Sequence, residues 1–113
     1  MAMTQDDARL SDFELLLALA MVRLGEDAYG AALAREIEER TRRQVSLGAI
    51  YKTLDRLGTK GYVSSRVGSP LGERGGRRRK YYELTAVGQA TLERSLQDID
   101  ALRQEIVPQR TSS

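Results

Sequence analysis

The chain has 113 residues and a net charge of +2, from 18 lysines and arginines against 16 acids, which is ordinary for one soluble domain. It has no cysteine and no histidine, so disulfides, thiolate zinc sites and the common nucleophile–base pairs of enzymes are excluded. The sequence therefore predicts a protein that is not an enzyme and holds no metal or other cofactor.

Residues 1–10 are mostly polar and are expected to be flexible. They lack the basic and apolar regions of a signal peptide. The longest apolar run, residues 15–22, is far shorter than the ~20 residues that span a bilayer. We therefore expect a soluble, cytoplasmic protein with no membrane partner.

Ser11 and Glu14 have the spacing of a capping box, which predicts a helix over residues 12–24. This helix is apolar almost all round, and one small domain cannot cover every side of it. We therefore expect it to contribute to an interface between subunits through Phe13, Leu16 and Leu17.

A second, amphipathic helix is predicted over about 28–41, and Ser46 is a suitable N-cap for a third helix over about 47–58. Apolar residues of the third helix recur at spacings of three and four and are expected to face the core: Leu47, Ile50, Leu54 and Leu57. The remaining positions are expected to face outward: Ser46, Gly48, Ala49, Tyr51, Lys52, Thr53, Asp55 and Arg56.

From residue 62 the pattern alternates. Segments 62–67 and 79–84 predict two strands, joined as a β-hairpin by a loop rich in glycine. Residues 66–80 carry six cations and one acid, a local charge of +5, so the rest of the chain sums to −3. This concentration favours a grip on a polyanion over an ordinary solvated loop, with its cations being Arg66, Arg74, Arg77, Arg78, Arg79 and Lys80.

Thr85 is expected to cap a last helix over about 86–107, followed by a flexible tail at 108–113. This helix would be about 33 Å long, more than one small domain can cover. Its apolar stripe is therefore expected to pack on a second subunit: Leu92, Leu96, Ile99, Leu102 and Ile106.

The predicted order α-α-α-β-β-α is a winged helix-turn-helix over residues 11–84 with a C-terminal dimerisation helix at 85–107. The third helix suits a major groove, and the wing suits phosphates or the minor groove. The expected DNA contacts are Ser46, Gly48, Ala49, Tyr51, Lys52, Thr53, Arg56, Arg74, Arg77, Arg78, Arg79 and Lys80. The alternative is a winged-helix module that docks an acidic protein partner.

Residues 47–61, the basic wing, residues 79–88 and the pair Tyr29-Gly30 closely resemble the PadR family of bacterial repressors, in its short form. The resemblance covers roughly residues 11–106. It implies a homodimer held by the last helix with help from the first, and a pseudo-palindromic double-stranded DNA site. It also implies repression, and release by a small-molecule effector in some members.

Overall fold

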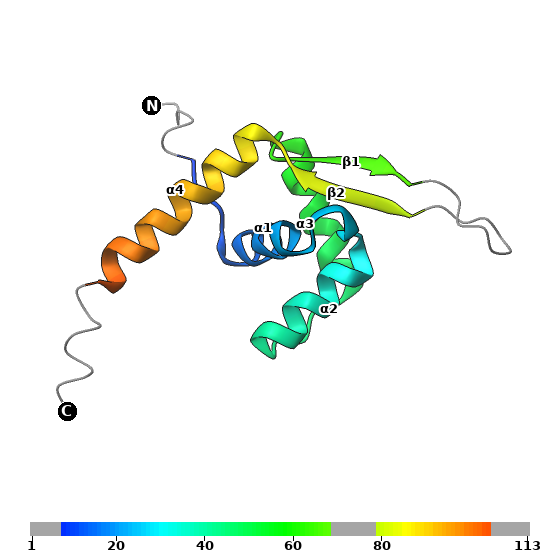
Figure 1. Cartoon of the computed structure of the whole chain (residues 1–113), viewed down its shortest axis with the longest axis horizontal. Helices are drawn as coiled ribbons and strands as arrows, with labels where there is room; N and C mark the ends of the chain where they lie inside the picture. Colours follow the sequence, from blue (N-terminus) through cyan, green and yellow to red (C-terminus); the bar gives the residue numbers. More distant parts are fainter. Residues whose placement is uncertain (1–7, 69–78, 105–113) are drawn as a thin grey trace, which may run out of the picture.

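The computed structural model describes residues 8–68 and 79–104 and contains three helices, a hairpin and a last helix in the predicted order (Figure 1). In chain order the elements are α1 (Asp12–Leu24), the 3₁₀ turn η2 (Gly25–Asp27), α2 (Gly30–Thr41), α3 (Leu47–Thr59), β1 (Val63–Val67), β2 (Lys80–Leu84) and α4 (Ala86–Arg103). The predicted winged helix-turn-helix class is confirmed. The predicted site residues that lie outside the described part of the chain are Arg74, Arg77, Arg78 and Ile106.

Side-chain caps begin three of the helices, as predicted. Glu14 Oε1 accepts a hydrogen bond from the Ser11 amide at 2.9 Å, which completes the capping box of α1. Ser46 Oγ accepts from the Ala49 amide at 3.0 Å at the start of α3. Thr85 does the same for α4. Each cap satisfies a backbone donor that the helix leaves unpaired.

The second helix begins at Gly30, two residues later than the predicted start at 28. The Ala28 carbonyl accepts from the Tyr82 amide at 2.9 Å, and Tyr29 forms an isolated bridge with Tyr81. Because this backbone is extended and paired with β2, it cannot also form the first turn of a helix. The hairpin is thereby fixed to the start of α2.

β1 and β2 are antiparallel, with a register from Val63 opposite Leu84 to Val67 opposite Lys80. Val63 is buried, whereas Val67 at the far end is exposed. The hairpin therefore contacts the core at its base and extends away from it (Figure 1).

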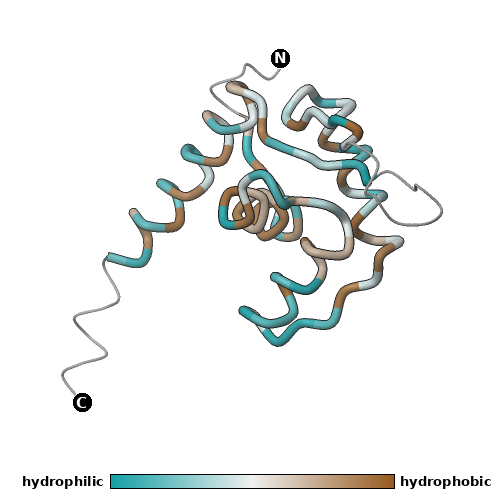
Figure 2. Tube along the Cα trace, turned by 45° about the vertical axis from the view of Figure 1, so that its right-hand side comes forward, coloured by the Kyte–Doolittle hydropathy of each residue, from teal (hydrophilic) through white to brown (hydrophobic). Residues whose placement is uncertain are grey.

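α1 lies at the centre of the fold, against α2, α3 and the base of the hairpin (Figures 1 and 2). The core is formed by apolar side chains from all of these elements, chiefly Leu17, Met21, Leu33, Ile37, Ile50, Leu54, Leu57 and Val63. Leu47 is 48% exposed, so the prediction that it faces the core is wrong. Leu47 lies in the first turn of α3, and this turn is outside the part of the helix that α1 and α2 cover.

α4 begins against the hairpin and runs away from the body on the side opposite to the wing (Figure 1). Hydrophobic positions recur along its projecting part (Figure 2). In the described part of the chain, the helices are too short or too polar to cross a membrane.

Candidate nucleic-acid interface

α3 presents one buried and one open face. Ile50, Leu54 and Leu57 face the core. Thr53 is only 4% exposed, so the prediction that it faces outward toward DNA is wrong. Thr53 is three residues from Ile50 and four from Leu57, and residues at these spacings share one side of a helix.

The start of α3 exposes small side chains and one cation. Gly48, Ala49 and Lys52 are all exposed, as predicted, and Lys52 has no ion-pair partner among the described residues. Ser46 is also exposed, but its hydroxyl already accepts the hydrogen bond that caps the helix. This surface lets another molecule approach the helix backbone closely without meeting a bulky side chain.

Tyr51 lies where α3 meets α2 and the hairpin. It is 45% exposed, and its ring and hydroxyl lie so close to the α carbon of Gly30 that a side chain at position 30 would collide with them. Burial raises the pKa of Tyr82, and the neighbouring Tyr51 and Asp55 raise it further. Tyr51 therefore presents part of its ring outward while its hydroxyl lies over the first turn of α2.

Arg56 is exposed, but it is engaged by an acid of α1, whereas the sequence predicted that it contacts DNA. Its Nε donates to Glu14 Oε2 at 3.2 Å, and Lys60 Nζ donates to the same oxygen at 3.0 Å. Both cations are on the flank of α3 that faces α1. Arg56 is therefore engaged by Glu14, whereas Lys52, four residues earlier on the same side of α3, has no such partner among the described residues.

Aromatic rings and arginines alternate near the outer end of the described hairpin. The guanidinium of Arg79 lies 4.3 Å from the centre of the Tyr29 ring, and that of Arg66 lies 4.7 Å from the centre of the Tyr81 ring. The two rings meet edge to face at 5.8 Å. Tyr81 therefore packs within the hairpin and against Tyr29, and Arg79 is held on the surface by a cation–π contact.

Apart from Arg94, the described cations divide into two groups by their partners. Those with an ion pair are Arg9, Arg23, Arg40, Arg43, Arg56 and Lys60. Those without an acid in ion-pair distance, among the residues that the structure describes, are Arg35, Arg42, Lys52, Arg66, Arg79, Lys80 and Arg103. All of the second group except Arg103 lie on α2, its C-cap, α3 or the hairpin. These elements therefore carry most of the described cations that no acid pairs.

A sequence profile described as the transcriptional regulator PadR-like family matches residues 18–94, more than half of the chain. The chain belongs to the PadR-like family of transcriptional regulators. No curated protein is similar enough in sequence to count as a match.

Solved structures of PadR proteins have the same fold. A PadR family transcription regulator from hypervirulent Clostridium difficile is 25% identical, with a TM-score of 0.68 over 85% of this chain and 96% of that one. A PadR-like regulator from Bacillus cereus is 23% identical, with a TM-score of 0.70 over 85% and 88%. A PadR family regulator from Eggerthella lenta is 23% identical, with a TM-score of 0.64 over 87% and 83%.

In this PadR-like chain the residues predicted for a subunit interface fall into two groups. Leu17 is fully buried and Leu92 is 4% exposed, so the prediction that these two form the interface is wrong, because their own domain already covers them. The others remain accessible: Phe13, Leu16 and Leu96 are half-buried, whereas Ile99 and Leu102 are exposed.

Sequence reasoning missed two residues of the PadR-like surface, Tyr29 and Arg35. Tyr29 lies against Arg79 and Tyr81 at the hairpin. Arg35 on α2 is exposed, and its only hydrogen bond among the described residues is a long one of 3.4 Å to the Tyr29 hydroxyl. Tyr29-Gly30 was the one available signal. The described residues include no group of acids placed to hold a metal ion.

Proposed function

We propose that this PadR-like protein is a homodimeric repressor that binds a specific double-stranded DNA site. The observation that carries the proposal is the position of the described cations that have no acid in ion-pair distance: all of those given above except Arg103 lie on α2, its C-cap, α3 or the hairpin. Phosphates attract such a face, and releasing their counterions supplies much of the binding free energy.

Within this proposal α3 enters the major groove. The small residues Gly48 and Ala49 allow the start of the helix to approach the base edges, and Lys52 is placed to donate to a guanine. Tyr51, Arg35 and Arg79 flank the helix and are assigned to phosphates. Contacts to phosphates set the position of the protein, whereas contacts to bases select the sequence.

The second copy is assigned to the open side of α4. Leu102 is 73% exposed and Ile99 is 41% exposed. Packing them on a partner removes apolar surface from water, worth roughly 25 cal/mol per Å². A symmetric pair would present two α3 helices to a pseudo-palindromic site.

Two finer parts of the proposal rest on the family alone. By analogy with other PadR proteins, a small-molecule effector releases this protein from DNA, and the protein acts in the cytoplasm. A DNA-binding protein of this kind requires no cofactor.

The test begins with selection of duplexes from a randomised library. Fluorescence anisotropy then measures the affinity for the enriched duplex and for a scrambled duplex of the same composition, between about 50 and 200 mM salt. A site-specific regulator with several phosphate contacts loses orders of magnitude in affinity over this range and prefers the enriched duplex.

Variant Lys52→Gln is expected to change which base the enriched duplex carries at one position, since one bidentate contact discriminates by about 1–3 kcal/mol. Equal binding of both duplexes, with heparin competing as well as DNA, would instead support the module that docks an acidic protein.

A further inference from the structure

Glu14 is the one buried charged residue in the part of the chain that the structure describes, with 3% of its side chain exposed. Oε1 accepts from the Ser11 amide, and Oε2 accepts from Arg56 and Lys60. Burial raises the pKa of this carboxyl, but the three donors outweigh it and hold the pKa below the ordinary value. The group is therefore ionised at neutral pH and fixed by three partners.

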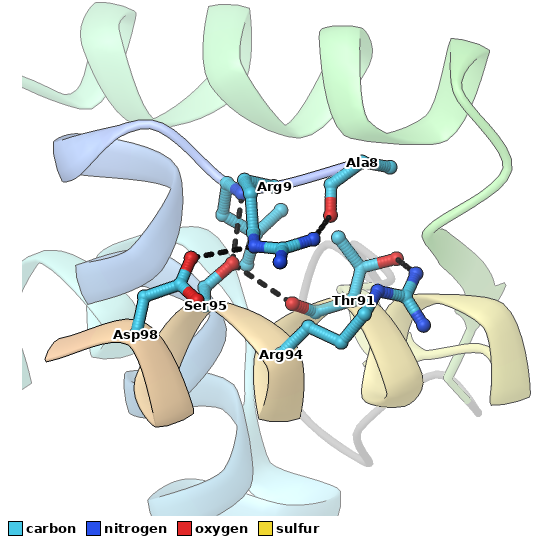
Figure 3. Close-up of polar contacts among 7 residues, drawn as sticks. Ala8, Arg9, Thr91, Arg94, Ser95 and Asp98 are labelled. Atoms are coloured by element: carbon cyan, nitrogen blue, oxygen red, sulfur yellow. Dashed lines mark hydrogen bonds and ion pairs between the residues drawn. The ribbon is translucent and has the colours of Figure 1, made fainter. Parts of the chain in front are cut away.

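The start of α1, which carries Glu14, is fixed in turn to α4 (Figure 3). The Leu10 amide donates to Ser95 Oγ at 2.9 Å, and Arg9 Nε donates to Asp98 at 2.6 Å. Ser95 is 5% exposed. A continuous set of polar contacts therefore runs from α4 through residues 9–14 to α3.

We propose that Glu14 is a positioning residue of the DNA-binding surface, which fixes the recognition helix α3 relative to the C-terminal helix α4. Arg56 and Lys60 are four residues apart, on one side of α3, and both meet the same carboxylate oxygen. Rotation of α3 about its axis, or sliding along it, breaks at least one of these contacts.

The consequence for DNA rests on the proposed function above. In a dimer held by α4, the position of α3 relative to α4 determines the distance and the angle between the two recognition helices. Two half-sites must match that distance, at roughly 34–36 Å or a multiple of it. Loosening α3 therefore lowers affinity for the correct spacing more than affinity for random DNA.

Variant Glu14→Gln isolates the charge, because glutamine at this position also completes a capping box. Glu36→Gln is the matched control. Glu36 Oε2 also accepts from two arginines, Arg23 at 2.7 Å and Arg40 at 3.1 Å, but it joins α1 to α2 without contacting α3.

Anisotropy would be measured with three probes: the duplex that the wild-type protein enriches from the library, its scrambled form, and the enriched duplex with one base pair inserted at its centre. All proteins are compared at a temperature where circular dichroism shows them folded.

For Glu14→Gln, the ratio of specific to random affinity is expected to fall about tenfold, and the inserted base pair is expected to cost less than in the wild type. Glu36→Gln should keep both values within about twofold, since it lies apart from α3. Merely reduced stability would lower both kinds of binding together, and would do so in both variants.

Wild-type values for Glu14→Gln in both the ratio and the insertion penalty would overturn the inference while leaving the proposed function intact. Failure of the wild-type protein itself to prefer its enriched duplex would instead reject the proposed function. If Glu14→Gln does not fold, Lys60→Gln replaces it, because Arg56 still pairs with the carboxylate. A smaller decrease in the same direction is then expected, and an unchanged ratio overturns the inference.

Discussion

Replacing each of two closely packed glycines by alanine is expected to have a different effect on stability. A methyl group at Gly88, in the first turn of α4, would collide with the backbone carbonyl of Tyr62. That carbonyl also accepts from the Thr85 amide at 2.9 Å, so it cannot move without disturbing the start of the helix. A methyl group at Gly30 would collide with Tyr51, but there the obstacle is the end of a half-exposed side chain that can rotate away.

For Gly88→Ala, the forced shift costs about 1–3 kcal/mol, and the strained hydrogen bond costs about 1 kcal/mol more. Better helix propensity returns about 0.5–1 kcal/mol. The free energy of unfolding should therefore fall by about 2 kcal/mol, which lowers the Tm of a domain of this size by about 8–16 °C. For Gly30→Ala, the rotamer change of Tyr51 costs about 0.5–1.5 kcal/mol and is nearly offset by propensity.

Thermal unfolding followed by circular dichroism, at one protein concentration for all variants, measures both effects. The Gly30→Ala variant is expected within about 5 °C of the wild type, since the two contributions nearly cancel. A Tm for Gly88→Ala equal to that of the wild type would refute the reasoning, because it would show that α4 and the hairpin can separate at no cost.

Three further outcomes are expected. Replacing the arginines of residues 77–79 by alanine should weaken binding to every duplex. A salt titration should also show a smaller slope of log affinity against log salt, by about 0.9 for each phosphate that the protein no longer neutralises. An unchanged slope would show that these arginines do not contact phosphates. Leu102→Glu should turn the dimer into a monomer in sedimentation experiments. A dimer of normal affinity would show that α4 does not form the interface between the subunits. Glu14 has a lowered pKa in the folded chain, so its contribution to stability is present above its ordinary pKa of 4.5 and disappears as the pH falls through the folded value. Acid titration of the wild type should show this decrease in stability. The stability of Glu14→Gln should depend less on pH.

Local patterns predicted the elements well because the interactions that form them are local. Ser11, Ser46 and Thr85 each cap the helix that the sequence assigned to them. Where a distant segment competes for the same groups, local patterns fail. The start of α2 was misplaced because Ala28 and Tyr29 pair with a strand more than fifty residues later.

The candidate site was harder to predict than the fold, because periodicity gives the direction of a side chain but not its neighbour. Arg56 and Lys52 both carry charge outside the core, yet only Arg56 meets a buried acid from another helix. Thr53 is polar but shares the buried side with Ile50, as its spacing on the helix indicates. Only the packing of α1 against α3 distinguishes Arg56 from Lys52.

The hairpin is attached to the start of α2, and this attachment does not depend on the segment between positions 68 and 79. The Tyr82 amide, in the middle of β2, donates to the Ala28 carbonyl, and the Gly68 amide donates to the Arg79 carbonyl at 2.8 Å, which closes the outer end of the described ladder. We therefore expect that segments of other lengths and charges can be grafted between positions 68 and 79 without disturbing α3. Under the proposed function, such grafts would change overall affinity for DNA while the preferred sequence stays the same.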